Sequence, residues 1–299
     1  MTGTVWGIDL GGTKIEGVVL PSAESTEAVC RLRVPTEAEK GYDHILSQVR
    51  ELVEAMSREA GSPPSAIGFG TPGVLDPDTM RIKNSNTTCL IGQPFQQDIE
   101  RDLGVEVVLA NDANCFALAE ARLGAARGAE IVFGIILGTG VGGGIVIGDK
   151  TLFGRQGIAG EWGHNILDPQ GPDCYCGRKG CVETFLSGPH LEKHYSGLSG
   201  QELSLPDIAS LHQQGRDPHA AATMERLVTY FGRAVASVIN ILDPHVVVLG
   251  GGVSNIDLLY SEGVREAERW VFNDRMHTRV AKNLLGDSAG VYGAAMLVA

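Results

Sequence analysis

The sequence predicts an α/β fold arranged in two lobes, and three observations lead to this expectation. Apolar residues make up 43% of the 299 residues, which is enough to bury a sizeable core. Strand-like and helix-like patterns alternate along the chain, as they do in layered α/β proteins. The segment VWGIDLGGTKIEGVVL at 5–20 also recurs, without gaps, as VFGIILGTGVGGGIVI at 132–147. A repeat at this distance indicates two lobes with the same opening topology, joined near residue 120.

The elements of the first half follow in order. Each copy of the repeat reads as a strand, a glycine turn and a returning strand. Residues 43–61, DHILSQVRELVEAMSREAG, are apolar at helical spacing and end in Gly61, a helix stop signal. Residues 66–75 predict a strand that runs into a Gly-Pro turn, and residues 105–124 predict a strand that leads directly into a helix.

The second half continues the same alternation. Residues 220–242 predict a long helix, which Asp243 and Pro244 end, and HVVVLGGG at 245–252 predicts a buried strand followed by a helix. We therefore expect a small N-terminal lobe at 1–120, completed by a closing helix at 288–299, and a larger lobe at 121–287.

Charge and composition narrow the class of protein. The net charge of -12 and the pI near 5.1 argue against a nucleic-acid or anionic-membrane surface, because both require clustered Lys and Arg. The chain has no apolar run of 18 residues and no N-terminal signal pattern, so we expect a cytoplasmic protein with small-molecule partners. Three isolated cysteines, Cys30, Cys89 and Cys115, are then expected as small buried hydrophobic residues.

The two glycine turns are candidates for phosphate binding. Glycines at 11 and 12 and at 138, 140 and 142–144 allow backbone N–H groups to approach a ligand closely. The alternative is that they only tighten two hairpins, but two matched turns, one of them with Asp9, Thr13 and Lys14, favour phosphate. GTGVGG at 138–143 also fits a dinucleotide-binding fingerprint. That fingerprint requires a helix after the glycines, but here a strand pattern follows, so we reject this interpretation.

Residues 160–183 contain a set of metal ligands. His164, Cys174, Cys176 and Cys181 offer one nitrogen and three sulfurs, a set that favours tetrahedral Zn²⁺ in a closed, structural site. Such an ion would order a glycine-rich loop and fix the two carboxylates beside it, Glu161 and Glu183. Fixed acceptors suit a polyhydroxylated sugar, although either glutamate alone could be a solvated loop charge.

The sequence NDAN at 111–114 lies where the strand predicted at 105–111 meets a helix. Asn111 or Asp112 could simply cap that helix. Asp112 could equally serve as the acceptor for the proton of an attacking hydroxyl, because a carboxylate at a helix N-terminus is held rigidly. The sequence leaves both interpretations open.

Four motifs together resemble one family. They are D-x-G-G-T-K at 9–14, L-G-T-G-V-G-G-G at 137–144, E-x-G-H at 161–164 and C-x-C-G-x-x-G-C-x-E at 174–183. In this combination the chain resembles the ROK family of sugar kinases and repressors, part of the two-lobed actin-like/hexokinase (ribonuclease H-like) ATPase fold. The resemblance implies that nucleotide and sugar bind in the cleft between the lobes.

The resemblance also implies roles for individual residues. Asp112 would be the general base, and Asp9 would act toward Mg²⁺ through water. The implied sugar ligands are Asn111, Asp112, Glu161, His164 and Glu183, with Asn86 either a further sugar contact or a turn residue. The implied ATP-binding residues are Asp9, Gly11, Gly12, Thr13, Lys14, Gly138, Thr139, Gly140, Gly250, Gly251 and Gly252.

Among the functions in this family, the sequence favours a kinase. A repressor would need a DNA-binding module ahead of the first strand, which starts near Val5, and a non-catalytic sugar-binding protein would not need both phosphate turns. The stretches around 86, 111, 162 and 174–187 look most like bacterial fructokinases, since N-acetylglucosamine kinases tend to have Phe where this chain has Trp162. We therefore expect D-fructose, with mannose tolerated, to be phosphorylated at O6. N-acetylglucosamine kinase and glucokinase are the alternatives, and a homodimer fits the resemblance although no stripe identifies an interface.

Overall fold

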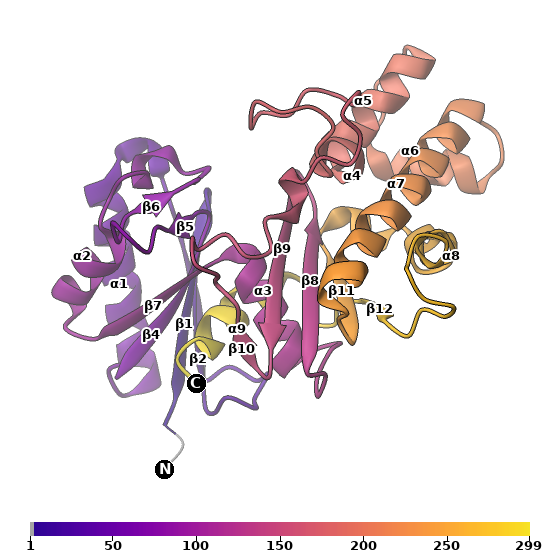
Figure 1. Ribbon diagram of the computed structural model, residues 1–299. Coiled ribbons are helices and arrows are strands. Elements are labelled where there is room, and N and C mark those ends of the chain that lie inside the picture. The colour runs from indigo at the N-terminus through magenta and orange to yellow at the C-terminus, as the bar shows by residue number, and fades with distance from the viewer. Residues whose placement is uncertain (1–2) are drawn as a thin grey trace. The chain divides into compact units, whose positions relative to one another are not determined.

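The computed structural model describes residues 3–299, which form two compact units (Figure 1). The first contains the described residues up to Gly128, together with Gly144–Ala159 and Leu284–Ala299. The second contains Ala129–Gly143 and Gly160–Asn283. Each unit is therefore assembled from segments that are far apart in the sequence.

Two five-stranded sheets form the framework. The first has the order β3-β2-β1-β4-β7, and the second has the order β10-β9-β8-β11-β12. The strands of the first sheet are β1 (Val5–Leu10), β2 (Lys14–Leu20), β3 (Cys30–Pro35), β4 (Ala66–Thr71) and β7 (Glu106–Asn111). The strands of the second are β8 (Ile131–Leu137), β9 (Val141–Ile147), β10 (Lys150–Thr151), β11 (Val246–Gly250) and β12 (Arg279–Lys282). A separate two-stranded ribbon joins β5 (Val74–Leu75) to β6 (Ile82–Lys83).

The two sheets have the same topology, which extends the repeat found in the sequence. In each sheet the first three strands lie side by side in chain order, and the next two add on the far side of the first strand. In the first sheet β2 is antiparallel to both β1 and β3, whereas β4 and β7 continue in parallel from β1. The second sheet likewise has β11 and β12 in parallel with β8. The expected α/β fold with two alike opening topologies is confirmed.

Four helices accompany the first sheet: α1 (Tyr42–Ala60), α2 (Phe95–Leu103), α3 (Asp112–Arg122) and α9 (Ala289–Met296). Buried apolar residues of α1 pack with those of the strands in one core, and Gly61 ends this helix at a φ of 74°. The C-terminal helix α9 returns to the N-terminal sheet, as the yellow ribbon in Figure 1 shows. A Cβ at Gly7 or Gly68 would collide with the α9 backbone, so these two glycines allow the close packing of that helix.

Five helices belong to the second unit: α4 (Glu183–Leu186), α5 (Gly188–Ser199), α6 (Leu205–Gln213), α7 (Pro218–Leu242) and α8 (Glu262–Glu268). The Asp217 carboxylate caps the start of α7 by accepting from two backbone N–H groups, and Asp243 ends it at a φ of 48°. Short 3-10 turns lie at Ala38–Lys40, Thr88–Leu90, Trp162–His164, Gly252–Asn255, Asp257–Tyr260 and Gly286–Ser288.

Two details differ from the sequence expectations. The segment after β11 forms two 3-10 turns before α8 begins, because Gly251 turns the chain at a φ of 80° and the Ser254 hydroxyl donates back to the Gly251 carbonyl. Cys89 is half-buried, whereas Cys30 and Cys115 are buried as expected. Among the described residues, no helix combines the length and the apolar character needed to span a membrane.

Candidate functional site

Asp112 lies at the junction between β7 and α3, as the sequence predicts. The Asn111 side-chain oxygen accepts from the backbone N–H of Asn114 at 2.8 Å, so Asn111 is the residue that caps this helix. One Asp112 carboxylate oxygen accepts from the N–H of Ala113 at 2.8 Å. The capping role therefore goes to Asn111, and the Asp112 carboxylate is not needed as the cap.

The charge state of Asp112 is set mainly by its surroundings. Asp112 retains an exposed surface, yet desolvation raises the pKa of its carboxyl, opposed by hydrogen bonds from its own backbone N–H and that of Ala113. Desolvation, and then the charge of Asp112, also raise the pKa of Asp9 to about 6. The first unit thus holds two electrostatically coupled carboxylates, an arrangement that favours a bound cation or proton near them.

The first glycine turn is closed by backbone bonds and fastened to a neighbouring segment. The Gly11 N–H donates to the Lys14 carbonyl at 2.9 Å. Thr36 binds the turn twice, through its hydroxyl to the Gly11 carbonyl at 2.6 Å and through its N–H to the Thr13 carbonyl at 3.0 Å. These bonds fix the turn without using the N–H groups of Gly12 and Thr13, which remain available to phosphate oxygens.

Lys14, expected near the phosphates, pairs with Glu16 at 3.1 Å. Glu16 is buried and also pairs with Arg31 and Arg33, which hold its pKa below the usual range although desolvation acts to raise it. The alternation of β2 could have identified Glu16, since its carboxylate occupies a position otherwise used by buried apolar residues.

Asn86 lies in an exposed bend between β6 and the 3-10 turn at 88–90. Its neighbour Thr87 is buried, and the Thr87 hydroxyl has no hydrogen-bond partner among the described residues. That hydroxyl lies 3.8 Å from the position a Cβ would take at Gly12. The bend therefore lies against the first glycine turn.

The second glycine turn lines a pocket of about 730 Å³ in the second unit. The Gly138 N–H donates to the Gly140 carbonyl, and the Gly188 N–H at the start of α5 donates to the Gly138 carbonyl, each at 2.9 Å. Gly138, Thr139 and Gly252 share this pocket, whereas Gly140, Gly250 and Gly251 are not among its lining residues. The structure therefore brings together the tip of the turn and Gly252, the last of the three glycines at 250–252 where β11 ends.

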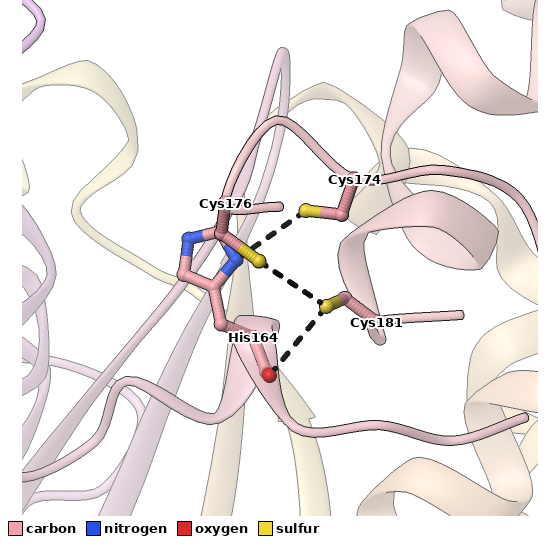
Figure 2. Close-up of side chains that lie close together, drawn as sticks. All are labelled: His164, Cys174, Cys176 and Cys181. Carbon is pink, nitrogen blue, oxygen red and sulfur yellow. Dashed lines mark hydrogen bonds between the residues drawn. The ribbon is translucent and has the colours of Figure 1, made fainter. Parts of the chain in front are cut away.

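The four expected metal ligands converge, as Figure 2 shows. Their donor atoms all lie within 4.8 Å of one another. The Cys176 and Cys181 sulfurs are 3.6 Å apart, and the Cys174 sulfur is 3.6 Å from Nδ1 of His164. Two thiolates on one tetrahedral Zn²⁺ would be separated by about 3.8 Å, given Zn–S bonds of about 2.3 Å. The donor set and its spacing therefore fit zinc.

The loop around this cluster has little regular structure of its own. Between Glu161 and Val182 it contains one 3-10 turn and two isolated bridges, Ile166 with Cys181 and Asp173 with Lys179. Glu161 is half-buried just before the 3-10 turn. Glu183 is buried, and its carboxylate accepts from the N–H of Val141 at 3.0 Å, which connects it to the second glycine turn. The idea that Glu183 is a solvated loop charge is therefore wrong.

Tyr175 is a member of this group that the sequence reasoning missed. Its hydroxyl lies 3.0 Å from Nε2 of His164, and its ring meets the imidazole edge to face, with 5.1 Å between centroids. If Nδ1 of His164 binds a metal, Nε2 carries the proton and donates to this hydroxyl. Its position in the sequence, between the expected ligands Cys174 and Cys176, could have identified it.

The comparisons with known proteins agree with this picture. The ROK family model matches residues 5–299. N-acetyl-D-glucosamine kinase of Yersinia pseudotuberculosis serotype O:3 (strain YPIII) is 37% identical over 302 residues, which cover 98% of each chain. The crystal structure of a ROK hexokinase from Thermus thermophilus has a TM-score of 0.89 at 36% identity and covers 98% of this chain and 97% of its own.

A ROK family glucokinase from Streptomyces griseus, solved with glucose and AMPPNP, has a TM-score of 0.78 at 30% identity over 99% of both chains. The expected likeness to fructokinases is not confirmed, because the relative at 37% identity is an N-acetyl-D-glucosamine kinase. The four motifs, the two alike sheets and the match over nearly the whole chain agree, and the chain therefore belongs to the ROK family, with the sequence and fold of its sugar kinases.

Proposed function

We propose that this protein is an ATP-dependent hexose kinase whose preferred acceptor is N-acetyl-D-glucosamine, phosphorylated at O6. The strongest support for kinase activity is Asp112, an accessible but desolvated carboxylate whose place at the start of α3 is fixed by the Asn111 cap. The support for this sugar is the 37% identity, over 98% of both chains, to an N-acetyl-D-glucosamine kinase.

Asp112 would accept the proton of the attacking O6 hydroxyl. Its raised pKa makes it a stronger base than an ordinary aspartate, which favours proton acceptance as the phosphoryl group is transferred. Asn111 would bind a sugar hydroxyl through its side-chain nitrogen, because its oxygen is occupied by the helix cap. Glu161 and Glu183 of the second unit and Asn86 of the first are further sugar ligands that we propose. His164 would join them by exchanging the Tyr175 hydroxyl at Nε2 for a sugar hydroxyl.

ATP would be bound by both glycine turns. The N–H groups of the first turn and Thr139 of the second would receive phosphate oxygens, with the adenosine in the pocket lined by Gly138 and Gly252. Mg²⁺ would supply charge neutralisation on the phosphates. Asp9 would face this ion. Burial, and then the charges of Asp112 and Glu16, raise the pKa of its carboxyl, and the charge of Lys14 opposes this only in part.

The His164–Cys174–Cys176–Cys181 cluster would hold a structural Zn²⁺. Four protein ligands leave no open position on the metal, so its contribution would be to order the loop that carries Glu161. The six cysteines are all free thiols, so the cluster can bind a metal without the reduction of any disulfide.

Trp162 was the main sequence feature that favoured fructose, and its position weakens that argument. It is 4% exposed and packs edge to face on Phe133, with 5.7 Å between the ring centroids. Its indole nitrogen lies 3.5 Å from the Gly142 carbonyl. An exchange of Trp for Phe here would therefore act first on the packing of the second unit.

A coupled ADP-release assay across N-acetylglucosamine, glucose, mannose and fructose tests the proposal, with zinc measured on the same sample. We expect the highest kcat/KM for N-acetylglucosamine. A higher value for fructose would restore the fructokinase assignment, and a higher value for glucose would favour a glucokinase. If none of the four sugars is phosphorylated, the result would favour a sugar sensor over an enzyme.

A further inference from the structure

A second pocket, of about 360 Å³, lies wholly within the first unit and includes Asn111 in its lining. It runs along β7, the edge strand of the first sheet, and the segment at 153–157 forms another wall. Val74, Leu75 and Phe153 give it an apolar surface. Asn111 is the one lining residue so far assigned to the sugar or to ATP, so those assignments do not explain the rest of this hollow.

The open edge of β7 offers backbone hydrogen bonds to this pocket. At Val107 the outward N–H donates to Glu100 at 3.2 Å, and the outward carbonyl accepts from Gln96 at 2.7 Å. Backbone groups alternate in direction along a strand, so Leu109 points its N–H and carbonyl to the same side, away from β4. Leu109 also lines the pocket, where those two groups can meet a ligand.

Asn114 supplies an unused side-chain oxygen beside the same space. It is 1% exposed, it lines the pocket, and its side-chain oxygen has no hydrogen-bond partner among the described residues. A buried acceptor oxygen without a partner is costly unless a ligand donates a hydrogen bond to it. Asn111, one turn earlier, has its oxygen in the helix cap and its nitrogen available as a donor.

We propose that this pocket is the subsite for the N-acyl group of an N-acylated hexosamine. An acetamido group carries an N–H, a carbonyl and a methyl group. The Asn114 amide can accept from the N–H, the Asn111 nitrogen or the Leu109 N–H can donate to the carbonyl, and the methyl group meets Val74, Leu75 and Phe153. Glucose has only a hydroxyl at this position, which leaves the apolar wall uncovered. This inference rests on the proposed function, because it assumes that the sugar binds at Asn111 and Asp112.

A pair of adjacent variants tests the subsite. Phe153 and Leu152 are 38% and 40% exposed, but only Phe153 lines the pocket. We expect Phe153→Ala to lower the ratio of kcat/KM for N-acetylglucosamine to that for glucose about tenfold. Leu152→Ala should leave the ratio unchanged. An equal ratio in Phe153→Ala and wild type, or the same loss in Leu152→Ala, would overturn the assignment.

The wild-type protein provides a second test that does not depend on the folding of a variant. Because the pocket is larger than an acetyl group, N-propanoyl- and N-butanoyl-glucosamine should be phosphorylated with kcat/KM within about threefold of the acetyl compound. A steep loss with each added carbon would contradict the subsite. Phosphorylation of glucose but not of N-acetylglucosamine would instead refute the proposed acceptor, and the subsite with it.

Discussion

The two regions that carry the proposed sugar ligands are held in place by different means. Asp112 and Asn111 stand at a strand–helix junction, where the helix cap and the buried residues of α3 fix the backbone. The loop that carries Glu161 and His164 has one 3-10 turn, two isolated bridges and a cluster of four metal ligands. The first region is therefore ordered by secondary structure, whereas the second, with little secondary structure, would depend for its order on a metal bound by these side chains. Perturbations that affect one region should spare the other.

The largest effect is expected at the strand–helix junction. Asp112→Asn should lower kcat at least a hundredfold, because the variant cannot accept the hydroxyl proton. Sugar affinity, measured by calorimetry, should change little, because the cap at Asn111 is retained. The exposed Asp274→Asn is the matched control and should behave as wild type. Turnover within tenfold of wild type in Asp112→Asn would remove the base assignment.

The metal cluster should produce the next largest effect, confined to the other region. Cys176→Ala should lose the bound zinc and raise the KM for sugar about tenfold or more, because the loop loses its ordering ligands. Cys176 is exposed, so the change leaves no cavity. Elemental analysis, kinetics and a thermal melt would check this, with Cys89→Ala as the control. Full activity in a zinc-free variant would show that the loop does not need the ion.

A single methyl group can test how closely the second glycine turn and Glu183 are joined. A Cβ at Gly140 would lie 2.8 Å from a Glu183 carboxylate oxygen, so Gly140→Ala should displace that carboxylate from the N–H of Val141. We expect kcat/KM to fall about tenfold, the scale of one charge-assisted hydrogen bond. Gly197→Ala on α5 meets open space and is the control. Unchanged kinetics in Gly140→Ala would mean that Glu183 is not needed at its observed position.

The smallest effect is one of stability and depends on pH. Asp9 has a pKa of about 6 in the fold against 3.8 as the ordinary value, so the folded state holds its proton more tightly than the unfolded chain. Its contribution to stability is present below pH 4 and is lost as pH rises through 6. In the absence of Mg²⁺, Asp9→Asn should therefore raise the melting temperature by a few degrees at pH 7.5 and leave it unchanged at pH 4. An equal shift in melting temperature at pH 4 and pH 7.5 would show that the effect does not come from the ionisation of Asp9.

Local patterns in the sequence were sufficient for much of the fold and for part of the site. The glycine turns, the end of α1 at Gly61 and the junction at Asn111 each depend on residues close together in the chain, so spacing alone predicts them. The metal cluster was also predictable, because His164 and the three cysteines occur within 18 residues, from 164 to 181. Its affinity for zinc remains a prediction.

Features that depend on contacts between distant segments could not be predicted from local sequence patterns. The bond from the N–H of Val141 to Glu183 joins residues 42 positions apart, and no local pattern near either residue predicts it. The pocket beside β7 exists only because the segment at 153–157 reaches the sheet edge. We expect the choice of sugar to depend on such walls. Trp162, on which the expectation of fructose partly rested, packs on Phe133 and does not by itself decide the sugar.

The return of α9 to the first sheet has a consequence for synthesis on the ribosome. All strands of that sheet have been synthesised once the ribosome has added Asn111. Gly7 and Gly68 are covered only later, when residues 289–296 have been synthesised and pack on them. Until then one face of the nascent sheet keeps its apolar residues in water. The second unit can fold in the meantime, so the half of the protein translated first becomes mature last.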